Sequence, residues 1–150
     1  MRYMGLDLGT RTLGISLSDT THTIATLYDT IRFSDSNYDE LIPQLKEIIK
    51  ENDVNKIVLG LPKNMNNTIG PRALVTMEFM EKLKNELHIE VVMQDERLST
   101  VEATNYMIEA DVSRKKRKKK IDSLAANIIL QTYLDKEKER GIEYGRKDDI

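Results

Sequence analysis

Four acidic residues stand beside apolar segments, where an unpaired buried carboxylate would be costly. Asp7 interrupts the apolar run RYMGLDL, Asp95 and Glu96 directly follow IEVVMQ, and Asp122 precedes SLAANIIL. Carboxylates gathered without histidine or cysteine repel one another unless a hard cation lies between them. Oxygen ligands alone suit Mg²⁺ or Mn²⁺. Two such ions would activate a water molecule and stabilise the leaving oxygen of a phosphodiester.

The acidic residues can do this chemistry only if the fold brings them together. Asp7 lies late in a predicted strand and the Asp95–Glu96 pair follows another, so in parallel neighbouring strands both would lie at the carboxyl edge of the sheet, where ligands usually bind. Asp122 has an ordinary alternative role, because an acid in the first turn of a helix complements the helix dipole. The small residues Ala125 and Ala126 would nevertheless let that helix approach the sheet closely.

A basic run, RKKRKKK over 114–120, precedes Asp122 directly. It holds seven of the 23 basic residues, so the rest of the chain has 16 bases against 25 acids. A basic block on an acidic body suggests a polyanionic partner, and binding through it should weaken steeply with salt. The alternative is a solvated loop without a partner.

The composition of the chain excludes several other kinds of site and of protein. The chain has no cysteine, which excludes disulfides and thiolate chemistry, and its two histidines, His22 and His88, make a histidine-rich metal site unlikely and are assigned no chemistry. We find no apolar run of about 18 residues and no secretory signal. We therefore expect a cytoplasmic protein with no membrane partner, with one domain over 1–136 and a charged, disordered tail over 137–150.

The pattern of apolar residues predicts alternating strands and helices. Strands are expected over 2–8, 14–18, 23–33, 56–62 and 89–94, and helices over 36–52, 71–87, 99–110 and from 121 onward. We expect Ser36 or Asn37 to cap the first helix and Pro43 to lie in its first turn. The second helix should bury one face, formed by Leu74, Phe79, Met80, Leu83 and Leu87. The fold class is α/β, with a mixed sheet whose first three strands are antiparallel and whose later strands are parallel.

Four segments, in order, resemble the YqgF (RuvX) family: GLDLGTRTLGISLSD, VLGLPKNMNNTIGPRA, DERLST and KKKIDSLAANIIL. The resemblance covers about residues 2–134. It implies a single ribonuclease H-like domain with a five-stranded sheet flanked by helices. Members of this family are described as Holliday junction resolvases or as nucleases that mature the 5′ end of pre-16S ribosomal RNA.

The resemblance also implies roles for individual residues. Asp7, Glu96 and Asp122 would be the catalytic, metal-binding carboxylates, with Asp95 as a supporting acid. Glu96 is favoured because neighbouring residues in an extended segment point to opposite faces. Many ribonuclease H-like nucleases carry an acid after the fourth strand, whereas VLGLPKN offers none.

Nucleic-acid contacts are expected from Thr10, Arg11, Lys63, Asn64, Arg97, Arg114, Lys115, Lys116, Arg117, Lys118, Lys119 and Lys120, although each of the first five suits an ordinary turn equally well. Arg72 fits a surface helix position better than phosphate binding.

The sequence therefore favours a Mg²⁺- or Mn²⁺-dependent endonuclease, with pre-rRNA maturation preferred on the resemblance. A Holliday junction resolvase remains an alternative and would require a two-fold homodimer. A non-catalytic ribosome-assembly factor would keep the fold and the basic run. DLGT also fits the first phosphate loop of sugar kinases, but 150 residues leave no room for their second half.

Overall fold

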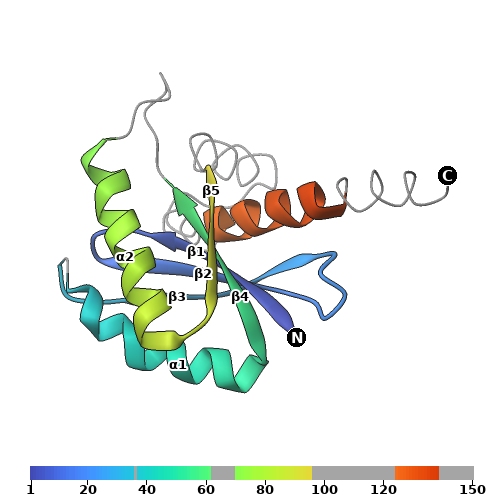
Figure 1. Ribbon diagram of the computed structural model, residues 1–150, viewed down its shortest axis with the longest axis horizontal. Coiled ribbons are helices and arrows are strands. Elements are labelled where there is room, and N and C mark those ends of the chain that lie inside the picture. The colour runs from blue at the N-terminus through green and yellow to red at the C-terminus, as the bar shows by residue number, and fades with distance from the viewer. Residues whose placement is uncertain (36, 62–69, 96–123, 139–150) are drawn as a thin grey trace, which may run out of the picture.

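The computed structural model describes residues 1–35, 37–61, 70–95 and 124–138, which form a mixed five-stranded sheet with helices on both faces (Figure 1). The strands are β1 (Arg2–Leu8), β2 (Thr12–Ser18), β3 (Ala25–Arg32), β4 (Val54–Leu61) and β5 (Glu90–Asp95). Their spatial order is β3-β2-β1-β4-β5, antiparallel from β3 to β1 and parallel from β1 to β5. This confirms the predicted mixed sheet, with strand bounds that differ by a few residues.

Two helices cover one face of the sheet. They are α1 (Leu41–Asn52) and α2 (Pro71–Leu87), and they enclose a core with alternate residues of the strands. Met4, Leu6 and Leu8 of β1 all point into this core. Because successive side chains of a strand point to opposite faces, Tyr3, Gly5 and Asp7 lie on the other face.

Two details of these helices differ from the predictions. A 3₁₀ turn, η1 (Tyr38–Glu40), leads directly into α1. Asn37 lies at the N-cap of this turn, without a side-chain cap hydrogen bond, whereas the N-cap of α1 itself is Glu40, and Ser36 lies outside the described residues. Pro43 does lie in the first turn of α1. Leu74 of α2 is 57% exposed, because the buried stripe of α2 contains Ala73, Thr76, Phe79 and Leu83 instead.

The helix over 124–138 packs on the opposite face of the sheet (Figure 1). Ile129, Leu130 and Leu134 form a second core with Tyr3 of β1 and Val58 of β4. β4 is therefore covered on both faces, which explains its continuous apolar run. None of the helices in the described ranges is long and apolar enough to cross a membrane.

Lys56 of β4 joins the far end of this helix to the sheet. Its Nζ donates to Tyr133 Oη at 3.0 Å and to Glu137 Oε1 at 3.3 Å, and it lies 4.7 Å from the centre of the Tyr3 ring. A second carboxylate, Glu90, lies 3.4 Å away. Burial lowers the pKa of Lys56, but the hydrogen bond to Tyr133 and the charge of Glu137 outweigh it, so the pKa is raised overall. Lys56 therefore stays charged throughout the physiological range.

Replacing Lys56 by methionine should loosen the helix over 124–138. The variant keeps most of the apolar stem but leaves Tyr133 and Glu137 without their charged donor, which should cost about 2 kcal/mol and lower Tm by about 5 °C. Lys46→Met on the exposed face of α1 is the control. Equal Tm values for the two variants in thermal unfolding would show that Lys56 does not stabilise the helix.

Candidate active site at the carboxyl edge of the sheet

Asp7 lies at the carboxyl end of the central strand and is half-buried. Its partner in β2 is Gly14, and the pairing of β1 with β4 ends one residue before Asp7, at Leu6 with Leu59. Gly5 precedes it on the same face of β1. Gly5 and Gly14, the sheet positions before and opposite Asp7 on this face, therefore carry no side chains, an arrangement typical of a place where a ligand or another backbone approaches closely.

The helix over 124–138 does approach the sheet closely next to Asp7. Ser16 Oγ donates to the carbonyl of Ala126 at 2.9 Å. A Cβ atom added to Gly5 would lie 2.7 Å from Leu130 Cβ and 2.8 Å from the Ala126 carbonyl oxygen. Ala125 and Ala126 are fully buried. The close packing predicted from these small residues is confirmed.

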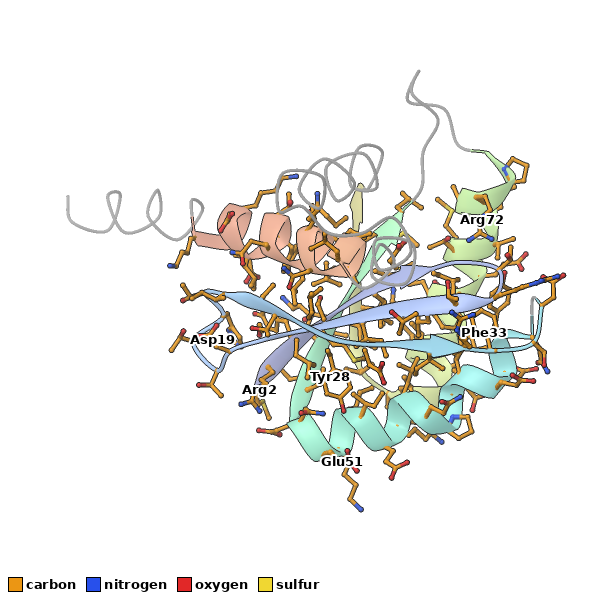
Figure 2. All side chains as sticks on the ribbon, turned by 180° about the vertical axis from the view of Figure 1, so that it is seen from behind. Arg2, Asp19, Tyr28, Phe33, Glu51 and Arg72 are labelled. Carbon is orange, nitrogen blue, oxygen red and sulfur yellow. The ribbon has the colours of Figure 1, made fainter. Side chains whose placement is uncertain are left out.

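This helix runs antiparallel to β1. Ala126 lies over Gly5, whereas Tyr133 and Glu137 lie near the amino ends of β1 and β4. Its N-terminal end is consequently directed toward the carboxyl edge, where Asp7 lies (Figure 2). The positive end of the helix dipole stabilises negative charge at that edge. Ser16 helps to set this geometry, and a serine inside an apolar strand was the sequence signal for it.

The ends of β4 and β5 lie at the same edge. Asp95 is the last residue of β5 and pairs with Leu61, the last residue of β4. With β4 between them, β1 and β5 are about 10 Å apart at a strand spacing of about 4.8 Å. Glu96, Arg97, Lys63, Asn64, the predicted helix over 99–110, the basic run 114–120 and Asp122 all lie outside the described residues.

Two of the predicted nucleic-acid contacts belong to the β1–β2 turn. Thr10 and Arg11 are exposed at its tip, and Gly9 N–H donates to the Thr12 carbonyl at 2.8 Å to close it. Arg11 lies 4.0 Å from the Asp35 carboxylate, with both side chains mostly exposed. An exposed ion pair of this kind is weak and can be exchanged for another anion.

Arg72 is not the surface residue that the sequence suggested. It is half-buried in the first turn of α2, and its Nη2 donates to the Leu8 carbonyl at 2.6 Å. Figure 2 shows it at the same end of the sheet as Phe33, whose N–H donates to the Arg11 carbonyl. The sequence did carry a signal for this contact. A cation in the first turn of a helix opposes the helix dipole and so needs another partner.

The described residues at this edge offer oxygen donors, which suit a hard cation, but they do not by themselves complete a metal site. Asp7 supplies carboxylate oxygens, and no histidine lies in β1, β4 or β5. In the described ranges, no three acidic or histidine side chains come together as a metal-binding group. A complete site at Asp7 therefore depends on further acids of the sequence.

Comparisons with known proteins agree with this geometry. The family model described as "RuvX: Holliday junction resolvase" matches residues 1–136. A protein of Bacillus mycoides (strain KBAB4) named "Putative pre-16S rRNA nuclease" is 50% identical over 135 residues, which are 90% of this chain and 98% of the relative. A protein of the same name from Bacillus cereus (strain AH187) is 48% identical over 136 residues, 91% of this chain and 99% of that one.

Two solved structures share the fold at low sequence identity. RuvC of T. thermophilus in complex with a Holliday junction substrate has a TM-score of 0.58 at 13% identity, with 93% of this chain and 96% of that one covered. The Fowlpox virus resolvase with Holliday junction DNA has a TM-score of 0.56 at 12% identity, with 91% and 98% covered. The expected ribonuclease H-like fold is confirmed, and the match over residues 1–136 together with the 50% identity shows that the chain belongs to the RuvX (YqgF) family.

Proposed function

We propose that this protein is a metal-dependent endonuclease that hydrolyses phosphodiesters in structured nucleic acid, with 5′ maturation of pre-16S rRNA as its cellular role. The observation that carries the proposal is the position of Asp7. Its carboxylate is half-buried at the carboxyl end of the central strand, among glycine positions, on the face toward which the N-terminal end of the helix over 124–138 is directed. This is where open α/β sheets bind ligands.

The proposed metal ligands are Asp7, Glu96 and Asp122, with Asp95 in support. Val92 of β5 packs in the second core, on the Asp7 face, whereas Val91 and Met93 pack with α1 and α2. This alternation favours the even-numbered Glu96 over Asp95. Asp122 precedes the described helix by two residues, and that end of the helix is directed toward the edge that carries Asp7.

The chemistry follows from a cluster of acids. Mg²⁺ or Mn²⁺ ions, when bound, would supply an activated water and would stabilise the leaving oxygen. Asp7 and its companion carboxylates would hold the cations. Thr10 and Arg11, with Lys63, Asn64, Arg97 and the run 114–120, bind the phosphate backbone. Such contacts fix position without reading sequence, and they weaken as salt rises.

A titration of Mg²⁺ and of Mn²⁺ tests the proposal. Purified protein is mixed with a labelled pre-16S rRNA fragment and, separately, with a labelled four-way DNA junction, each with and without EDTA. We expect metal-dependent cleavage of the RNA near the mature 5′ end and none in EDTA. Binding of both substrates without cleavage of either, at any metal concentration, would contradict the proposal and favour a non-catalytic assembly factor.

Holliday junction resolution is the second candidate, because the matching family model carries that description. Symmetric cleavage of two strands requires a two-fold dimer, whereas trimming of one RNA end does not. The mass in solution, measured alone and with the junction, separates the two functions. A dimer on the junction with paired nicks would favour the resolvase. A role in rRNA maturation would place the protein in the cytoplasm.

A further inference from the structure

Arg72 connects the first turn of α2 to the strand that carries Asp7. Its Nη2 lies 2.6 Å from the carbonyl oxygen of Leu8, a residue 64 positions away in the sequence. The contact is half-buried, and Leu8 itself is only 4% exposed. A charged donor at this distance makes one of the stronger hydrogen bonds in proteins. The contact therefore holds a defined atom next to Asp7.

The Leu8 carbonyl needs a donor from outside the sheet. Gly9 N–H bonds to Thr12 in the β2 direction, and successive residues of a strand direct their amide and carbonyl groups alternately to the two sides. The carbonyl of Leu8 consequently points toward β4, whose pairing with β1 ends at Leu6. A buried carbonyl without a partner is unfavourable, and Arg72 supplies that partner at the place where the ladder stops.

Helix stability does not explain an arginine at this position. Arg72 follows Pro71, the first residue of α2, and a cation there faces the positive end of the helix dipole. The backbone of Arg72 is also held within the helix, because Thr76 Oγ1 donates to the Arg72 carbonyl at 2.9 Å and Thr76 is fully buried. The contact with the Leu8 carbonyl holds the guanidinium at the end of β1.

We infer that Arg72 is a positioning residue for Asp7. By fixing the Leu8–Gly9 peptide, one residue beyond Asp7, it keeps the carboxylate in the orientation that binds metal, and it acts through the backbone rather than by touching substrate. A catalytic group must be held within about 0.5 Å of its productive position, and at Asp7 the strand is paired with β2 alone, because its pairing with β4 ends at Leu6. The inference rests on the proposed metal-dependent nuclease function.

The test compares Arg72→Met with Arg2→Met. Arg2 is the matched control, because its Nη1 also donates to a backbone carbonyl, that of Asn52, but at the amino end of the same strand. Mn²⁺ affinity is measured by calorimetry without nucleic acid, and kcat and KM are measured on the cleaved substrate. For Arg72→Met we expect Mn²⁺ affinity and kcat each to fall by about tenfold or more, with KM within about twofold of the wild type.

A third variant separates positioning from folding. Arg72→Lys keeps one charged donor on a shorter side chain and should recover part of the lost Mn²⁺ affinity, with all affinities compared well below the lowest Tm of the variants, where each protein is folded. If Arg72→Met binds Mn²⁺ and turns over as Arg2→Met does, the inference is overturned. A rise in KM with unchanged kcat and Mn²⁺ affinity would overturn it in favour of direct phosphate binding.

The nuclease proposal and the inference about Arg72 can be refuted separately. Wild-type protein that binds Mn²⁺ but cleaves neither substrate would refute the nuclease proposal, while the calorimetric comparison of Arg72→Met with Arg2→Met would still decide the role of Arg72. Wild-type protein that binds no Mn²⁺ would overturn both.

Discussion

Asp7→Asn should abolish cleavage and leave nucleic-acid binding at least as strong as in the wild type. The amide has nearly the same shape as the carboxylate but loses the charge that would hold a divalent cation in the proposed site. Loss even of an outer partner of a metal site costs about 10–100-fold, so loss of a ligand should lower kcat by on the order of 100-fold or more. Removing one negative charge also reduces repulsion of the phosphate backbone.

The measurement pairs a cleavage assay with a binding assay in EDTA on the same labelled RNA. Glu47→Gln makes the same chemical change on the exposed face of α1 and serves as the control. We expect Glu47→Gln to cleave as the wild type does. Equal cleavage by Asp7→Asn and Glu47→Gln would remove Asp7 from the mechanism, whatever the true substrate is.

Gly5→Ala should disturb both stability and activity, because the new methyl group has no space. Its Cβ would lie 2.5 Å from Ser16 Oγ and under 3 Å from Leu130 Cβ and the Ala126 carbonyl oxygen. The last two atoms belong to the helix over 124–138, so the helix must move away from β1. Overpacking of this kind costs about 3 kcal/mol, which corresponds to a fall in Tm of about 10 °C for a chain of this size.

The same displacement should lower cleavage. An error of about 1 Å in a catalytic arrangement can cost on the order of 100-fold in rate, and the helix that moves begins two residues after Asp122. Assays run well below the Tm of the variant separate this effect from unfolding. Ser16→Ala is the companion variant, because it removes the hydrogen bond to Ala126 without adding volume and should cost only about 1 kcal/mol. A Tm for Gly5→Ala within about 2 °C of the wild type would contradict the close approach.

The elements were predictable because their signals are local. A short apolar run with β-branched residues indicates a strand wherever it lies, and the change to a spacing of three and four residues indicated α1. The helix over 124–138 was predictable for the same reason, and Glu137 extends it past the domain boundary expected at residue 136, while the division between domain and tail stays a prediction. Asp7 stood out because a carboxylate inside an apolar strand needs a purpose.

Some predictions were wrong because the burial or hydrogen bonding of the residue depends on parts of the structure that its own sequence surroundings do not reveal. Leu74 suited the apolar stripe of α2 by its type, but the angle at which α2 meets the sheet buries Ala73 and Thr76 and leaves Leu74 exposed. Arg72 read as a surface residue because nothing nearby in the sequence reveals the Leu8 carbonyl. The expected start of α1 was too early, because the 3₁₀ turn with Asn37 at its N-cap takes up the residues before it.

The sequence by itself determined the order of strands and helices, the family and the acids that are candidates for metal binding, since these depend on residue types and on spacing along the chain. Only the tertiary structure decided which residues surround Asp7. The register of β1 with β2 sets Gly14 beside its carboxylate, and Gly5 and Ser16 bring a helix from the far end of the chain against that face. Arg72 reaches the strand end from another layer. The Arg72–Leu8 and Ser16–Ala126 hydrogen bonds join residues 64 and 110 positions apart, and local sequence signals do not extend over such separations.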